Sequence, residues 1–108
     1  MGQLAWLYLI LAGLFEIAWP IGLKLAQSSQ YRVLGIVVAL LGMGISGWLL
    51  WLAQKQIPLG TSYAVWTGIG AAGTALLGIV LFAESVSIIK VFSLLCIVLG
   101  IIGLKGST

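Results

Sequence analysis

Four long apolar runs, separated by brief polar breaks, dominate the chain. About twenty mostly apolar residues are needed for a helix to cross the roughly 30 Å hydrocarbon core of a bilayer. The runs meet that requirement, and they cover residues 4–23, 33–52, 58–82 and 88–104. The sequence therefore predicts a multi-pass membrane protein with a single four-helix transmembrane domain over residues 1–108.

The composition excludes an ordinary soluble domain. Of the 108 residues, 62% are hydrophobic and only 6% are charged, whereas about a quarter of the residues of a soluble domain are charged. An open sheet would leave backbone groups unpaired in lipid, and the sequence has no alternating barrel pattern, so the predicted fold class is all-α. No basic segment precedes the first run, which we interpret as an uncleaved span and not as a signal peptide.

The basic residues stand singly near the ends of the runs, as in helices whose long side chains reach the lipid headgroups, and this pattern predicts no nucleic-acid partner. Four spans place both termini and the second break on one side of the membrane, with Lys55 and Lys105. The opposite side carries Lys24, Arg32 and Lys90. Two basic residues against three give almost no positive-inside signal. Either this signal is too weak to reveal the orientation, or the protein inserts both ways round.

Glu16 is the acidic residue that lies inside an apolar run. It follows Leu4 by twelve residues, about 18 Å along a helix, which places it near the membrane midplane. An ionised carboxylate is costly there, so Glu16 is expected to hold either a proton or a cation, and the small chain is expected to oligomerise around it. The alternative is a hydrogen-bonded acid that only joins helices. Glu84, in the third break, is expected to be solvated.

Aromatic side chains are predicted to form the walls of a site around this acid. Trp19 follows Glu16 by three residues on the same helical face, where its ring suits a cation; the alternative is an interfacial anchor. Tyr63 and Trp66 are also three apart, and their polar atoms could donate hydrogen bonds to a carboxylate.

Small residues mark the remaining candidate positions. Gly68 and Gly70 predict a conformational hinge in the third run, with plain close packing as the alternative. Gly100 and Gly103 indicate that the fourth run is an oligomerisation helix. Ser46 is by itself a weak signal, because serines in such helices commonly bond to their own backbone.

The chain has no histidine, and Cys96 is its one cysteine. A disulfide framework and a clustered Cys/His metal site are thereby excluded within one chain. No nucleophile–base pair is present either. We therefore expect no metal, no cofactor and no enzymatic activity.

Three segments resemble the small multidrug resistance family, and within it the guanidinium-exporter branch: residues 13–19 (GLFEIAW), 58–70 (PLGTSYAVWTGIG) and 99–105 (LGIIGLK). The resemblance covers essentially the whole chain. Two features depart from the family pattern. Pro20 stands where the family usually has a small residue, and the first loop is one residue longer.

The resemblance implies an antiparallel, dual-topology homodimer in a bacterial inner membrane. In the family, the acid at the position of Glu16 binds both the substrate and protons. The fourth helices, with Gly100 and Gly103 here, form the dimer contact. The residues that match the surroundings of the acid are Trp19, Ser46, Tyr63 and Trp66.

The function implied is proton-coupled export of guanidinium or small guanidinyl cations. The chemistry agrees, because a planar guanidinium matches the two oxygens of a carboxylate. Three alternatives remain: export of quaternary ammonium or aromatic cations, a role as one subunit of a heterodimeric exporter, and, less favoured, a membrane subunit that transports nothing.

Overall fold

The computed structural model of the protein describes residues 2–107 and confirms the all-α prediction for that range. Its helices are α1 (Gly2–Ala26), α2 (Arg32–Ala53), α3 (Leu59–Phe82) and α4 (Ile88–Ser107). Each is long and apolar enough to cross a membrane. A helix suits lipid because it pairs its backbone groups internally. Residues 1 and 108 of the expected domain lie outside the described range.

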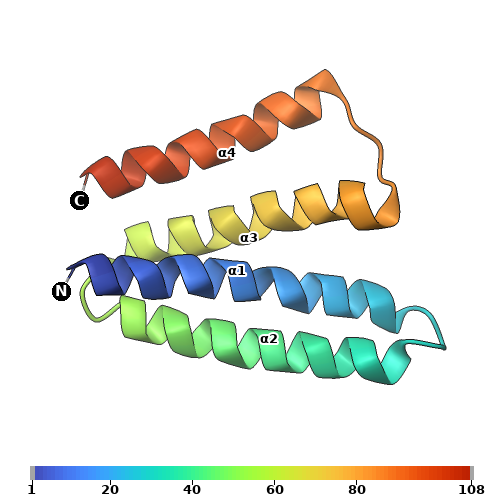
Figure 1. The fold of residues 1–108 in the computed structure, drawn as a ribbon. Helices are drawn as coiled ribbons and strands as arrows, with labels where there is room; N and C mark the ends of the chain where they lie inside the picture. Colours follow the sequence, from blue (N-terminus) through green and yellow to red (C-terminus); the bar gives the residue numbers. More distant parts are fainter. Residues whose placement is uncertain (1, 108) are drawn as a thin grey trace.

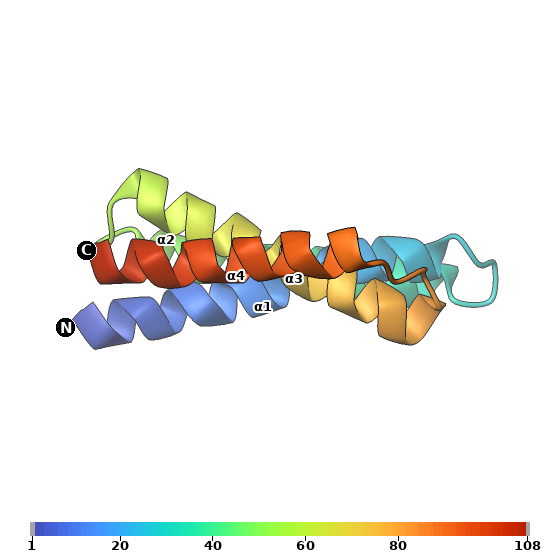
Figure 2. The same ribbon diagram turned by 90° about the horizontal axis from the view of Figure 1, so that it is seen from above.

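The helices lie side by side in the order α2, α1, α3, α4 (Figure 1). The molecule measures 44 × 34 × 17 Å, so its smallest dimension is less than two helix diameters of about 10–12 Å each. Both termini and the α2–α3 connection lie at one end, as expected, and the other two connections lie at the opposite end; the view from above in Figure 2 agrees. A layer this thin cannot surround a solute, so a site on it is open along one face.

Helix α1 approaches α2 most closely where two glycines face each other. A Cβ atom added to Gly22 would lie 2.5 Å from the carbonyl oxygen of Gly35 and 2.7 Å from the backbone nitrogen of Ala39. A Cβ on Gly35 would collide in turn with the carbonyl oxygen of Gly22 and with the backbone of Ala26. Backbone therefore packs directly on backbone at this crossing, which is how helices without a hydrophobic driving force associate in lipid.

The buried apolar core lies toward the end of the molecule that holds the termini. It joins the first half of α1 with the last turns of α2 and the first half of α3. Its buried members are small or branched: Ala5, Leu9, Ala53, Ile57 and Val65. In the opposite half, beyond the middle of α1, a groove separates α1 from α3, and this is the open half of the molecule.

Helix α4 is attached loosely. Among the described helices its backbone lies close to α3 alone, and none of its described residues is buried. Near its end the Lys105 ammonium lies 5.3 Å from the centroid of the Trp6 ring, a cation–π contact that ties α4 to the start of α1. Most of its apolar surface is left uncovered within the chain.

The turn after α3 determines where the third loop goes. Ala83 adopts the left-handed conformation at φ 54°, and its N–H donates to the carbonyl of Gly78. The N–H of Glu84 donates to the same carbonyl at 3.2 Å. A left-handed residue directly after a helix is a common way to end it, and here it directs residue 84 back toward α3. Helix α4 begins directly after Ser87. The hydroxyl of Ser87 accepts a hydrogen bond from the backbone N–H of Lys90 at 3.1 Å.

The α1–α2 crossing yields a stability prediction. Gly22→Ala should destabilise the protein by about 1–3 kcal/mol, because the new methyl group meets backbone atoms that cannot rotate away. The matched control is Gly44→Ala in α2, where a Cβ would meet nothing within 4 Å. The midpoint of SDS-induced unfolding in detergent is the measurement. Equal midpoints for the two variants would contradict the contact.

Candidate functional site

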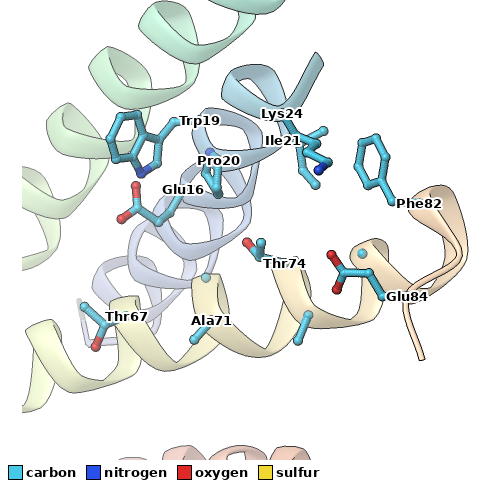
Figure 3. Close-up of a pocket in the computed structure, with 13 residues that line it drawn as sticks. Glu16, Trp19, Pro20, Ile21, Lys24, Thr67, Ala71, Thr74, Phe82 and Glu84 are labelled. Atoms are coloured by element: carbon cyan, nitrogen blue, oxygen red, sulfur yellow. The ribbon is translucent and has the colours of Figure 1, made fainter. Parts of the chain in front are cut away.

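A groove of about 600 Å³ runs between α1 and α3 in the open half of the molecule. Figure 3 shows Glu16 and Trp19 toward its inner end, and Lys24, Phe82 and Glu84 toward its outer end. The inner end lies halfway along α1, and the outer end lies where the first and third loops emerge. The groove therefore connects the middle of the span with one face of the membrane.

Glu16 occupies its position because α3 offers it a glycine. A Cβ on Gly70 would lie 2.8 Å from the Cγ of Glu16, so any side chain there would displace the acid. The contact is reciprocal, since a Cβ on Gly13 of α1 would lie 2.7 Å from the Cβ of Ile69. Two small residues on facing helices thus bring α1 and α3 together at the depth of the acid.

The Glu16 carboxylate is left available by the protein. It is partly buried, and within residues 2–107 no group donates a hydrogen bond or forms an ion pair with it. Trp19 lies beside it on the same wall of the groove. Pro20, one turn after Glu16, lies inside α1 and has no N–H to donate to the Glu16 carbonyl. The wall thus offers a carboxylate, an aromatic ring and a backbone stretch with one donor fewer than usual.

Ser46 is the centre of a hydrogen-bonded link between three helices. Its hydroxyl is fully buried and donates to the carbonyl oxygen of Ala12 at 2.6 Å. It accepts a hydrogen bond from the indole Nε1 of Trp66 at 2.8 Å. Ala12 lies one helical turn before Glu16, so the link fixes α1 beside the acid. Ser46 does not use the common partner of such serines, a carbonyl of its own helix, because the helix crossing brings the carbonyl of Ala12 within reach.

Tyr63 and Trp66 of α3 lie beside this link and not on the wall of the groove. The rings of Tyr63 and Trp66 lie 5.5 Å apart at an interplanar angle of 52°. Since the indole N–H is bound to Ser46, it does not donate to Glu16. Tyr63 is 55% exposed, and neither ring borders the groove. The structure therefore brings Trp19 to Glu16 directly, whereas Ser46, Tyr63 and Trp66 form a neighbouring cluster behind α1.

The four glycines singled out in the sequence differ in their surroundings. A Cβ on Gly68 would lie 3.0 Å from the Cδ1 of Ile101, so Gly68 lets α4 approach α3. Gly70 seats Glu16. A Cβ on Gly100 or Gly103 would meet nothing within 4 Å, and both glycines lie on the exposed surface of α4.

Several groove residues could not be assigned to the site from the sequence. Thr74 lies on the α3 wall, and Glu84 lies at the outer end beside Lys24. One signal was present: Gly70 and Gly78 are eight residues apart, so they lie near one face of a helix with Thr74 between them. The position of Glu84 could not be read in this way, because it depends on the turn at Ala83.

The chain resembles known proteins along nearly its whole length. Residues 4–97 match the family model described as Small Multidrug Resistance protein. A protein of Yersinia pseudotuberculosis named guanidinium exporter is 51% identical over 102 residues, which cover 94% of this chain and 97% of the relative. Proteins with the same name from Escherichia coli K12 and Proteus vulgaris are 49% and 46% identical and cover 97% and 94% of the chain, and 99% and 97% of their own lengths.

These matches confirm the resemblance inferred from the sequence motifs. Relatives that extend along nearly the whole chain and four helices able to span a bilayer identify a multi-pass protein of the bacterial inner membrane. The chain belongs to the small multidrug resistance family.

Proposed function

We propose that this protein exports guanidinium or small guanidinyl cations in exchange for protons, with Glu16 as the shared binding group. The observation that carries the proposal is the Glu16 carboxylate itself. It lies halfway along a spanning helix, it borders a groove that reaches one membrane face, and no group within residues 2–107 bonds to it. The names of the relatives support the choice of cation.

The chemistry follows from the cost of an empty charge in a membrane. An ionised carboxylate near the midplane is destabilised unless it binds a cation or takes up a proton. A guanidinium ion places two N–H groups opposite two carboxylate oxygens, and Trp19 can cover its flat face. A site that holds either a proton or the cation, but never both, exchanges one for the other when it opens to opposite sides.

We further propose that two copies of this four-helix domain form an antiparallel homodimer. Three observations support it: the molecule is only 17 Å thick, α4 has no buried residue, and Gly100 and Gly103 are free of contacts. The counts of two and three basic residues on the two sides agree with insertion in both orientations. In this assembly the clusters around Ser46, Tyr63 and Trp66 frame the paired acids, and α3 bends at Gly68 and Gly70.

The first test is the pH dependence of guanidinium binding to the purified protein in detergent. Under direct competition for Glu16, affinity falls as the pH is lowered, by up to about tenfold per pH unit for each proton displaced. Glu16→Gln, which cannot ionise, should abolish binding and exchange, while Glu16→Asp should retain part of both. A quaternary ammonium ion assayed in parallel tests the multidrug alternative. An affinity that does not change with pH would require separate proton and substrate sites.

The second test addresses orientation. In a Cys96→Ser background, single cysteines replace Ser29 in the first loop and Gln56 in the second loop. Insertion both ways round should make each position reactive to an impermeant maleimide added outside intact cells, because each loop lies outside in part of the population. Labelling of one loop alone would establish a fixed orientation. Two lysines added near the N-terminus should shift the ratio, since so small a charge difference sets it.

The third test concerns the link through Ser46. Ser46→Ala should destabilise the protein by about 1 kcal/mol, because the indole N–H of Trp66 loses its acceptor. The control is Ser93→Ala in α4, whose exposed hydroxyl bonds only to the carbonyl of Ile89 in its own helix, at 2.8 Å. SDS-induced unfolding compares the two. A midpoint for Ser46→Ala equal to that of the control would show that the link contributes nothing measurable.

A further inference from the structure

Glu84 does not extend into solvent away from the protein, although it lies in a loop. The left-handed turn at Ala83 brings its side chain back over α3. Its Oε1 atom lies 2.5 Å, and its Cδ 2.9 Å, from the point that a Cβ on Gly78 would occupy. The carboxylate can rest there only because residue 78 has no side chain. It borders the same groove as Glu16, and half of its side chain, 51%, is exposed.

The two acidic side chains of the groove each rest on a glycine of α3, Glu16 through its Cγ atom and Glu84 through its carboxylate. Glu16 rests on Gly70 and Glu84 rests on Gly78. These glycines are eight residues apart, which corresponds to about 12 Å along α3. Thr74 lines the groove midway between them (Figure 3), and its hydroxyl has no hydrogen-bond partner within residues 2–107. A polar path thus leads from the membrane face to Glu16.

The charges around the outer end make Glu84 distinctive. The face of the membrane on which the groove opens carries Lys24, Arg32 and Lys90, and Glu84 is the acidic residue of that face in the described chain. Lys24 borders the groove as well. The Lys90 ammonium lies 3.8 Å from the Glu84 carboxylate, but it also donates to the carbonyl of Ser85 at 3.0 Å. Without Glu84, a cation that approached the groove would meet positive charge alone.

We propose that Glu84 recruits the transported cation: it attracts guanidinium from the aqueous phase to the mouth of the groove, from which the cation passes Thr74 to reach Glu16. This role rests on the proposed export function and adds a second carboxylate to the path. An exposed charge at the rim of a site acts mainly on the rate of encounter and on its salt dependence. At about 6 Å in water, one unit charge changes the local cation concentration about threefold.

A structural role for Glu84 is the competing explanation, because its ion pair with Lys90 could simply hold the third loop. The two explanations predict opposite effects of Lys90→Gln on transport. If the pair only holds the loop, Glu84→Gln and Lys90→Gln remove the same interaction and shift activity in the same direction. If Glu84 recruits the cation, Glu84→Gln weakens transport at low substrate concentration. Lys90→Gln then frees the Glu84 carboxylate and strengthens transport.

The experiment measures guanidinium-driven currents in proteoliposomes on a solid support, at low and at high ionic strength. Glu84→Gln should raise KM about threefold at low salt and leave kcat near that of the unmodified protein. The difference should largely disappear in 0.5 M salt, where screening acts within a few ångströms. Lys90→Gln should lower KM, and Glu84→Asp, which keeps the charge, should stay close to the unmodified protein.

Gly78→Ala provides an independent arm without a change of charge. The added methyl group displaces the Glu84 carboxylate from the groove, so KM should rise, while alanine favours the helix. Size-exclusion chromatography verifies that each variant is folded. If Glu84→Gln does not fold, the Gly78→Ala and Lys90→Gln variants still decide between the two explanations. An unchanged KM for Glu84→Gln, or equal shifts for Glu84→Gln and Lys90→Gln, overturns recruitment and leaves export standing. Absence of any guanidinium current from the unmodified protein overturns the export function instead.

Discussion

Close backbone approach around α1 is the condition on which the rest of this structure depends. In lipid, helices gain little from burying apolar side chains, so they associate where small residues allow tight packing. Helix α1 meets such residues on both sides: Gly35 of α2 faces Gly22, and Gly70 of α3 receives Glu16. Glu16 therefore keeps its position because Gly70 has no side chain. A side chain at residue 70 would push Glu16 out of the groove without touching the acid's own helix.

The sequence predicted the spans and the acid because both depend on local properties. An apolar run of sufficient length has one stable form in a bilayer, and a carboxylate inside it is conspicuous. Trp19 could be placed beside Glu16 because three residues along one helix define a common face. None of these inferences needs to know how the helices cross.

What the sequence could not provide depends on the crossings and turns. A serine in such a helix commonly bonds to a carbonyl of its own helix, and only the packing of α2 against α1 offers Ser46 the carbonyl of Ala12 instead. The same packing turns the indole of Trp66 to Ser46 and away from the acid. Glu84 is exposed, as expected for a loop residue. Its place beside the groove was not predicted, because no sequence pattern indicates that Ala83 will adopt a left-handed conformation and return the next residue to the helix.

The exposure of α4 has a consequence for how such a protein changes over time. Since most of its residues are exposed within the chain, an apolar substitution at an exposed position of α4 leaves the packing of α1, α2 and α3 as it was. Selection on α4 then acts through whatever covers it, lipid or another subunit, and hardly through the fold of its own chain. The residues by which α4 contacts another subunit can therefore change in evolution while the groove between α1 and α3 stays the same.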